Sequence, residues 1–136
     1  MFKRISHVCV NSSDLQRTMG FYALLGCESV VAFTRKGRQI GAFLRIAEND
    51  FVEIFEKPSV VTTSPLGIHH FCLEVDDLDT TIANLRSKGL TVKDKNKGCD
   101  GTWQTWLQDP DGNRIELHQY TPESLQLTGG TAEVDW

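Results

Sequence analysis

Two histidines and two glutamates recur in this sequence of 136 residues at one fixed spacing. Glu53 follows His7 by 46 positions, and Glu116 follows His70 by the same number. Imidazole nitrogens and carboxylate oxygens are ligands of first-row divalent metal ions, and two of each leave coordination positions for water or a substrate. An isolated glutamate in a strand is usually a solvated surface residue, so this interpretation depends on the four residues acting together. The pattern therefore predicts an open metal centre of the catalytic kind.

An internal repeat explains the spacing, because residue i resembles residue i + 63 along much of the chain. The segment ISHVCVNSSDL at 5–15 aligns with IHHFCLEVDDL at 68–78 without a gap. Farther along, VEI at 52–54 falls on IEL at 115–117. Each half therefore carries one histidine and one glutamate at equivalent positions.

The first half is predicted to form a strand, a helix and three further strands. SHVCV at 6–10 alternates as a strand does, and Ser12 or Ser13 is expected to cap a helix that ends at Gly26. Three strand-like stretches follow, near 28–34, 39–47 and 51–57.

The second half repeats this order of elements. HHFCLEV at 69–75 is the expected strand, Asp76 or Asp77 the expected helix cap, and Gly89 the expected helix end. Strand-like stretches follow near 90–95, 102–108 and 113–120. The sequence thus predicts an α+β fold of two tandem βαβββ modules, residues 1–60 and 66–122, followed by a C-terminal tail at 123–136.

Side chains alternate between the two faces of a strand, and this alternation places the four ionisable residues on one side of their sheets. Val52 and Ile54, for example, share one face while Glu53 between them points to the other. The apolar face is the one that an amphipathic helix would cover. Two imidazoles and two carboxylates are therefore expected on the opposite, open face.

The sequence resembles the vicinal oxygen chelate superfamily, which includes glyoxalases, bleomycin resistance proteins and extradiol dioxygenases. The resemblance covers HVCVNSSDLQRTMGFYALLG at 7–26, GIHHFCLEVDDLDTTIANLRSKG at 67–89 and DPDGNRIEL at 109–117, of which the last is the most specific. It implies one compact domain in which the modules form open, cup-shaped mixed sheets around a divalent metal, with the helices on the outer face.

Within the superfamily, a His/Glu/His/Glu set is similar to that of glyoxalase I, the lactoylglutathione lyase. This resemblance implies that His7, Glu53, His70 and Glu116 bind a divalent ion such as Ni, Co, Zn, Mn or Fe. It also implies a small-molecule substrate, the hemithioacetal of a 2-oxoaldehyde with a thiol such as glutathione, isomerised through a metal-stabilised enediolate. Glu116 is then the first candidate for the base, with Glu53 as a ligand and second proton shuttle. A homodimer with sites at the interface is expected as well.

Two alternative functions remain open on the same resemblance. An Fe(II) extradiol-type dioxygenase needs only two histidines and one glutamate, which His7, His70 and Glu116 would supply. A metal-free drug-binding resistance protein would use the cleft alone. Methylmalonyl-CoA epimerases usually carry Gln where Glu53 stands, so Glu53 favours the glyoxalase I interpretation.

Composition excludes several other functions. Fourteen basic against 18 acidic residues give a net charge of −4, and RKGR at 35–38 is the longest basic cluster, so no nucleic-acid partner is expected. No apolar run approaches the roughly 18 residues of a membrane span, and MFKRISHV at the N-terminus lacks the apolar core of a secretion signal. A cytoplasmic protein is therefore expected.

The remaining reactive side chains receive structural interpretations. The four cysteines form no CxxC pair and are expected to be reduced thiols, mostly in the core, although Cys9 and Cys72 share the face of the histidines. His118 is expected to be a polar rim residue, and RKGR the tip of a hairpin. Aromatic residues could wall an apolar pocket, namely Phe51, Phe55, Trp103 and Trp106.

Overall fold

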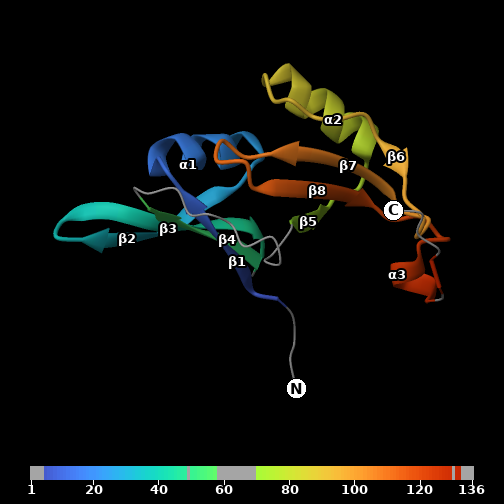
Figure 1. The fold of residues 1–136 in the computed structure, drawn as a ribbon, viewed down its shortest axis with the longest axis horizontal. Coiled ribbons are helices and arrows are strands. Elements are labelled where there is room, and N and C mark those ends of the chain that lie inside the picture. Colours follow the sequence, from blue (N-terminus) through green and yellow to red (C-terminus); the bar gives the residue numbers. More distant parts are fainter. Residues whose placement is uncertain (1–4, 49, 58–69, 130, 133–136) are drawn as a thin grey trace. The chain divides into compact units, whose positions relative to one another are not determined.

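The computed structural model describes residues 5–48, 50–57, 70–129 and 131–132 (Figure 1). The chain divides into two compact units, Met1–Gly67 with Asp109–Asn113, and Ile68–Gln108 with Arg114–Trp136. Each unit contains a four-stranded mixed sheet with a helix on one face. The predicted α+β class with two βαβββ modules is confirmed.

Unit 1 has its strands in the order β1-β4-β3-β2, with β1 parallel to β4 and the other pairs antiparallel. Its elements are β1 (His7–Ser12), α1 (Leu15–Leu24), β2 (Glu28–Arg35), β3 (Arg38–Ala47) and β4 (Asp50–Glu56). Helix α1 packs on β3 and β4. The core between them consists of buried side chains from both layers: Val10, Leu15, Tyr22, Ala42, Leu44, Val52 and Ile54.

Unit 2 repeats this topology with the strand order β5-β8-β7-β6 and a parallel β5–β8 pair. Its elements are β5 (Phe71–Glu74), α2 (Leu78–Ser87), β6 (Asn96–Lys97), β7 (Trp103–Gln108), β8 (Arg114–Gln119) and the short α3 (Leu125–Thr128). Leu78, Ile82 and Leu85 recur at helical spacing and bury one side of α2, which packs on β7 and β8. Within the described part of the chain, no helix is both long and apolar enough to cross a membrane.

Both main helices are capped at their N-termini by equivalent aspartates, Asp14 and Asp77. Each carboxylate accepts a hydrogen bond from the N–H three residues on, at 3.0 Å and 2.6 Å respectively. The predicted cap at Ser12 or Ser13 is wrong, because Ser12 still belongs to β1 and Ser13 precedes the capping residue. Asp77 was one of the two caps predicted for the second helix.

The predicted strand at 90–95 is wrong, because in this part of the chain only the two residues of β6 pair as a strand. Side chains bind carbonyl groups that a longer strand ladder would use. The Arg86 guanidinium donates to the Val92 carbonyl oxygen at 2.7 Å, and the Thr105 hydroxyl donates to the Lys93 carbonyl oxygen at 2.8 Å. These contacts hold the segment in an extended but non-strand path.

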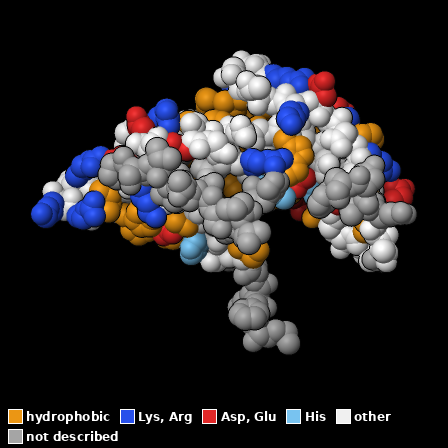
Figure 2. Space-filling view, viewed as in Figure 1, with side chains coloured by type: hydrophobic (Ala, Val, Ile, Leu, Met, Phe, Trp, Pro, Cys, Tyr) orange, Lys and Arg blue, Asp and Glu red, His pale blue; other side chains and the backbone are white. Residues whose placement is uncertain are grey.

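The predicted hairpin at RKGR is confirmed. Lys36 and Gly37, between β2 and β3, both have positive φ, of 52° and 77°, as a two-residue hairpin turn requires. Figure 2 shows basic side chains at the tip of this hairpin and hydrophobic side chains beside them over β2 to β4.

The turn Asp109–Asn113, which connects β7 to β8, belongs to unit 1. Asp111 Oδ1 accepts hydrogen bonds from the Ser13 N–H at 3.1 Å and the Arg17 guanidinium at 3.0 Å, and Oδ2 accepts one from the Thr18 hydroxyl at 3.0 Å. Burial alone would raise the pKa of Asp111, but these hydrogen bonds and the positive charge of Arg17 lower it overall. The DPDGN sequence thus attaches the turn to the start of α1.

Candidate functional site

Unit 1 places His7 and Glu53 side by side on the open face of its sheet, the face turned away from α1. His7 lies at the start of β1, and Glu53 lies on β4 directly opposite Cys9. His7 Nε2 is 3.8 Å from Glu53 Oε2, and the Glu53 side chain is 17% exposed. Partial burial, and then contact with the Glu53 carboxylate, raise the pKa of the Cys9 thiol to about 11. Cys9 is therefore a neutral thiol at pH 7.

Unit 2 repeats this pair with a shorter contact. His70 Nε2 lies 3.1 Å from Oε2 of Glu116, whose side chain is only 9% exposed. Glu116 lies on β8 opposite Cys72 of β5, as Glu53 lies opposite Cys9 in unit 1. A carboxylate this deeply buried needs charged or hydrogen-bonding neighbours, and the histidine beside it meets that need.

Each histidine also meets an aromatic ring at equivalent positions of the repeat. The rings of His7 and Phe43 lie edge to face with centroids 5.3 Å apart, and those of His70 and Trp106 do so at 4.8 Å. Phe43 pairs with Glu53 across β3 and β4, and Trp106 pairs with Glu116 across β7 and β8. Sequence analysis missed Phe43, although the offset of 63 residues from Trp106 would have identified it.

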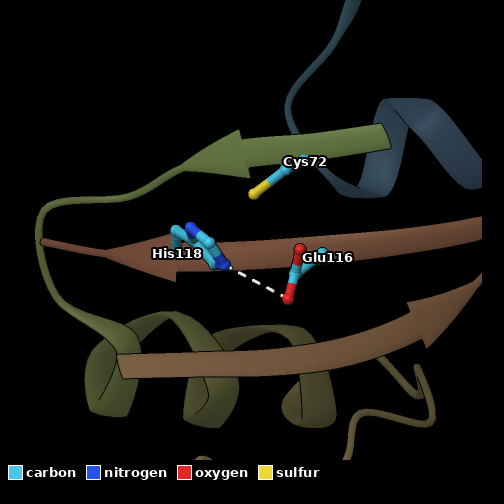
Figure 3. A group of neighbouring side chains, drawn as sticks. All are labelled: Cys72, Glu116 and His118. Carbon is cyan, nitrogen blue, oxygen red and sulfur yellow. Dashed lines mark ion pairs between the residues drawn. The ribbon is translucent and has the colours of Figure 1, made fainter. Parts of the chain in front are cut away.

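His118 is buried beside Glu116 and is not the rim residue that the sequence suggested. Its Nε2 lies 3.2 Å from Glu116 Oε1, so the two carboxylate oxygens of Glu116 each face a different histidine. Figure 3 shows His118 and Glu116 on β8 with Cys72 on the neighbouring strand. Ligand atoms of Cys72, Glu116 and His118 all lie within 4.8 Å of one another. Side chains alternate along β8, so His118, two residues after Glu116, lies on the same face. This alternation could have predicted from the sequence that His118 lies beside Glu116.

A hollow of about 500 Å³ lies next to His7 on unit 1. Its apolar lining comes from Val30, Val31, Phe43 and Phe51, and Arg45 lies at the same hollow. Phe33 extends this aromatic surface, with its ring 5.2 Å from that of Phe43. Such a surface, next to a histidine and a carboxylate, suits a small molecule that has both apolar and polar parts.

Two sequence interpretations need correction. The cysteines do not belong to the core: Cys9, Cys72 and Cys99 are exposed and Cys27 is half-buried, and all four are free thiols. Trp103 does not line the open face with Trp106. Successive residues of a strand point to opposite faces, so Trp103, three residues before Trp106, shares the helix-facing side of β7 with Thr105 and Leu107.

The structure therefore brings His7 to Glu53 and His70 to Glu116, each pair within its own unit. Both pairs have the donor types of a divalent metal centre. The union of the two pairs around a single ion stays a prediction.

Comparison with known proteins identifies relatives of this arrangement. Residues 4–117 match the family model described as the Glyoxalase/Bleomycin resistance protein/Dioxygenase superfamily. A search of curated proteins gives no match.

Solved structures share the fold over most of their length. A glyoxalase family protein from Enterococcus faecalis is similar with 29% identity and a TM-score of 0.76, covering 87% of this chain and 98% of that one. A lactoylglutathione lyase from Agrobacterium tumefaciens is similar with 20% identity and a TM-score of 0.67, covering 93% and 97%. A fosfomycin resistance protein from Listeria monocytogenes has 20% identity and a TM-score of 0.69, covering 91% and 98%.

Proposed function

Because the chain belongs to the Glyoxalase/Bleomycin resistance protein/Dioxygenase superfamily, we propose that it is a divalent-metal-dependent lyase or isomerase of the glyoxalase I type. The observation that carries the proposal is the occurrence of one His–Glu pair on the open face of each repeat, at 3.8 Å and 3.1 Å. A solved relative named lactoylglutathione lyase, similar in fold, supports the direction of this proposal.

The donor set fits a divalent cation. His7, Glu53, His70 and Glu116 would hold Ni, Co, Zn, Mn or Fe with two nitrogen and two oxygen donors. Glu116 Oε2 lies 3.1 Å from His70 Nε2, so the two donors from unit 2 are close enough to bind one cation together. When bound, the cation supplies positive charge that stabilises the negative oxygen formed as a proton leaves the adjacent carbon.

The two glutamates would move the proton. For a hemithioacetal of methylglyoxal and a thiol, Glu116 removes the proton from C1, and return of a proton to C2 yields the lactoyl thioester without net oxidation or reduction. Glu53, from the other repeat, is the second ligand and the proposed shuttle. The carboxylates have different surroundings, since Glu116 is the more buried of the two.

The hollow beside His7 would receive the apolar part of the substrate. Phe43 touches the His7 ring and lines the hollow, so a substrate group seated there lies next to the proposed centre. Arg45 at the same hollow offers a positive charge for a carboxylate, such as those of glutathione. A cytoplasmic homodimer completes the proposal, with no nucleic acid or membrane as partner.

The test is an assay of the full chain after removal of metal and separate reconstitution with each of the five ions. Methylglyoxal with glutathione is the first substrate pair, followed by other thiols and by catechols. We expect stoichiometric metal and formation of a thioester. Glu116→Gln keeps the size of the side chain but removes the base, and it should lower kcat by at least about 100-fold.

Glu123→Gln is the matched control, since Glu123 is exposed and lies outside the proposed centre. It should leave kcat unchanged. Full activity in Glu116→Gln would contradict the role of Glu116. Oxygen consumption with catechols would instead support the Fe(II) dioxygenase, and a protein that binds no metal would support the drug-binding alternative.

A further inference from the structure

Unit 2 holds a second group of potential metal ligands, of which the proposed catalytic set uses only Glu116. Cys72 and Glu116 lie opposite each other on the paired strands β5 and β8, and His118 follows two residues later on the same face of β8. Their sulfur, oxygen and nitrogen ligand atoms all lie within 4.8 Å of one another (Figure 3). A small inward shift of such atoms gives the ligand distances of a four-coordinate cation.

His118 supplies an independent observation. The residue is only 9% exposed, and its Nε2 is buried and has no hydrogen-bond partner among the described residues. Glu116 Oε1 lies at 3.2 Å, but the two groups do not have hydrogen-bond geometry. Buried polar atoms normally have a partner. This nitrogen faces a carboxylate and lies near a thiol, and a cation bound between the three groups would be its missing partner.

The first repeat shows what the second has added. Cys9 and Glu53 face each other on β1 and β4 as Cys72 and Glu116 do on β5 and β8. The residue equivalent to His118, however, is Phe55, which packs against Phe33 with ring centroids 5.0 Å apart. The chain therefore carries a matched internal control, a cysteine and a glutamate without the third donor.

Cys72 would bind the cation as a thiolate, beside the Glu116 carboxylate. The thiol proton would pass to solvent as the sulfur–metal bond forms, and no oxidation or reduction takes place.

We propose that unit 2 by itself binds a thiophilic divalent cation, such as Cd²⁺ or Zn²⁺, through Cys72 Sγ, the Glu116 carboxylate and His118 Nε2. The thiolate and imidazole donors favour these ions over Mn²⁺. The site goes beyond the proposed function and shares only Glu116 with it. Occupancy by a thiophilic ion and by the proposed catalytic ion would therefore exclude each other.

The test is titration of the metal-free full chain with Cd²⁺, followed by the ultraviolet charge-transfer absorption of a cadmium–thiolate bond. We expect one such bond per chain. Cys72→Ser should abolish the band, whereas Cys9→Ser should leave it unchanged. His118→Gln removes one of three ligands and should raise the Kd for Cd²⁺ by at least about tenfold.

The variants His7→Ala and Glu53→Gln separate this proposal from the proposed function. Both lie in unit 1, so they should leave the cadmium–thiolate band intact even where they abolish turnover. A band that persists in Cys72→Ser, disappears in Cys9→Ser, or keeps its Kd in a folded His118→Gln protein would overturn the proposal. If His118→Gln does not fold, the contrast between Cys72→Ser and Cys9→Ser still decides it.

Discussion

Equivalent residues of the two repeats have different surroundings. Glu53 has one histidine at 3.8 Å, whereas Glu116 has two, at 3.1 Å and 3.2 Å. A buried carboxylate depends on such neighbours more strongly than a partly exposed one. The two glutamates are thus symmetric in sequence and unequal in environment, which is why we assign them different roles.

Tyr22 is another residue whose surroundings decide its behaviour. It is fully buried under the sheet of unit 1, and its hydroxyl donates a hydrogen bond to Asp109 Oδ2 at 3.2 Å. Burial first, and then the negative charge of Asp109, raise the pKa of this phenol far above its usual range. The folded state therefore holds the proton that the unfolded chain releases near pH 10.

This difference predicts a loss of stability in alkali. The contribution of Tyr22 is fully present below about pH 10, and the free energy of unfolding then falls by about 1.4 kcal/mol per pH unit, because the folded state binds one proton more. Urea unfolding at pH 8 and pH 11 should show a loss about 1.4 kcal/mol smaller in Tyr22→Phe than in the native protein. Equal losses in both proteins would mean that Tyr22 titrates normally.

At this scale the sequence predicted which residues share a sheet face better than it predicted what surrounds them. His7, Glu53, His70 and Glu116 follow from the repeat, and their faces follow from strand alternation. The burial of His118 depends on how β5, β7 and β8 pack around it, which no local pattern records. Cys9 and Cys72 are exposed, and none of the described helices packs on the face that they share with the glutamates.

Local sequence patterns predicted the ends of the helices better than they predicted a segment that is held by contacts from other elements. The helix ends at Gly26 and Gly89 were predictable, because both have the positive φ, 91° and 84°, that glycine adopts most readily. The segment 90–95 was not, because the side chains of Arg86 on α2 and Thr105 on β7 bind the Val92 and Lys93 carbonyls that a strand would pair. Tertiary hydrogen bonds here override the strand preference.

Two glycines should respond in opposite ways to substitution by alanine. Gly20 lies inside α1, and an added Cβ would meet no described atom within 4 Å, so Gly20→Ala should stabilise unit 1 by about 0.5–1 kcal/mol. At Gly41 on β3, the Cβ would lie 2.6 Å from the Ile54 carbonyl oxygen and 2.7 Å from the Phe55 ring. Gly41→Ala should therefore destabilise by about 1–3 kcal/mol.

Urea unfolding of both variants measures these effects, each serving as the control for the other. A stabilising Gly41→Ala would show that β3 and β4 can separate without cost at this point.

For the whole molecule, the proposed centre requires donors from both compact units. Saturation with Mn²⁺, which the cysteine-containing group of unit 2 should not favour, is expected to raise the free energy of unfolding by about 2.7 kcal/mol at 100 times the Kd. Both His7→Ala and His70→Ala should abolish this increase, since each removes a ligand from a different unit. Thermal unfolding with and without Mn²⁺ measures it.

An increase that survives His7→Ala would place the Mn²⁺ ligands in unit 2 alone. An increase that survives His70→Ala would place them in unit 1. Either result would contradict a centre that joins the two repeats.

The division of the chain into units was the least predictable feature. The sequence marks DPDGN as a turn within the second repeat, whereas Asp109–Asn113 belongs with unit 1. Asp111 binds Ser13, Arg17 and Thr18 through its carboxylate, and nothing in the spacing of these residues announces such a long-range contact.

The placement of this turn has a consequence for the first repeat by itself. A fragment that ends before the second repeat lacks Asp109 and Asp111, which leaves the Tyr22 hydroxyl and the start of α1 without these carboxylates. The first repeat therefore depends on a segment of the second to complete its own hydrogen bonds.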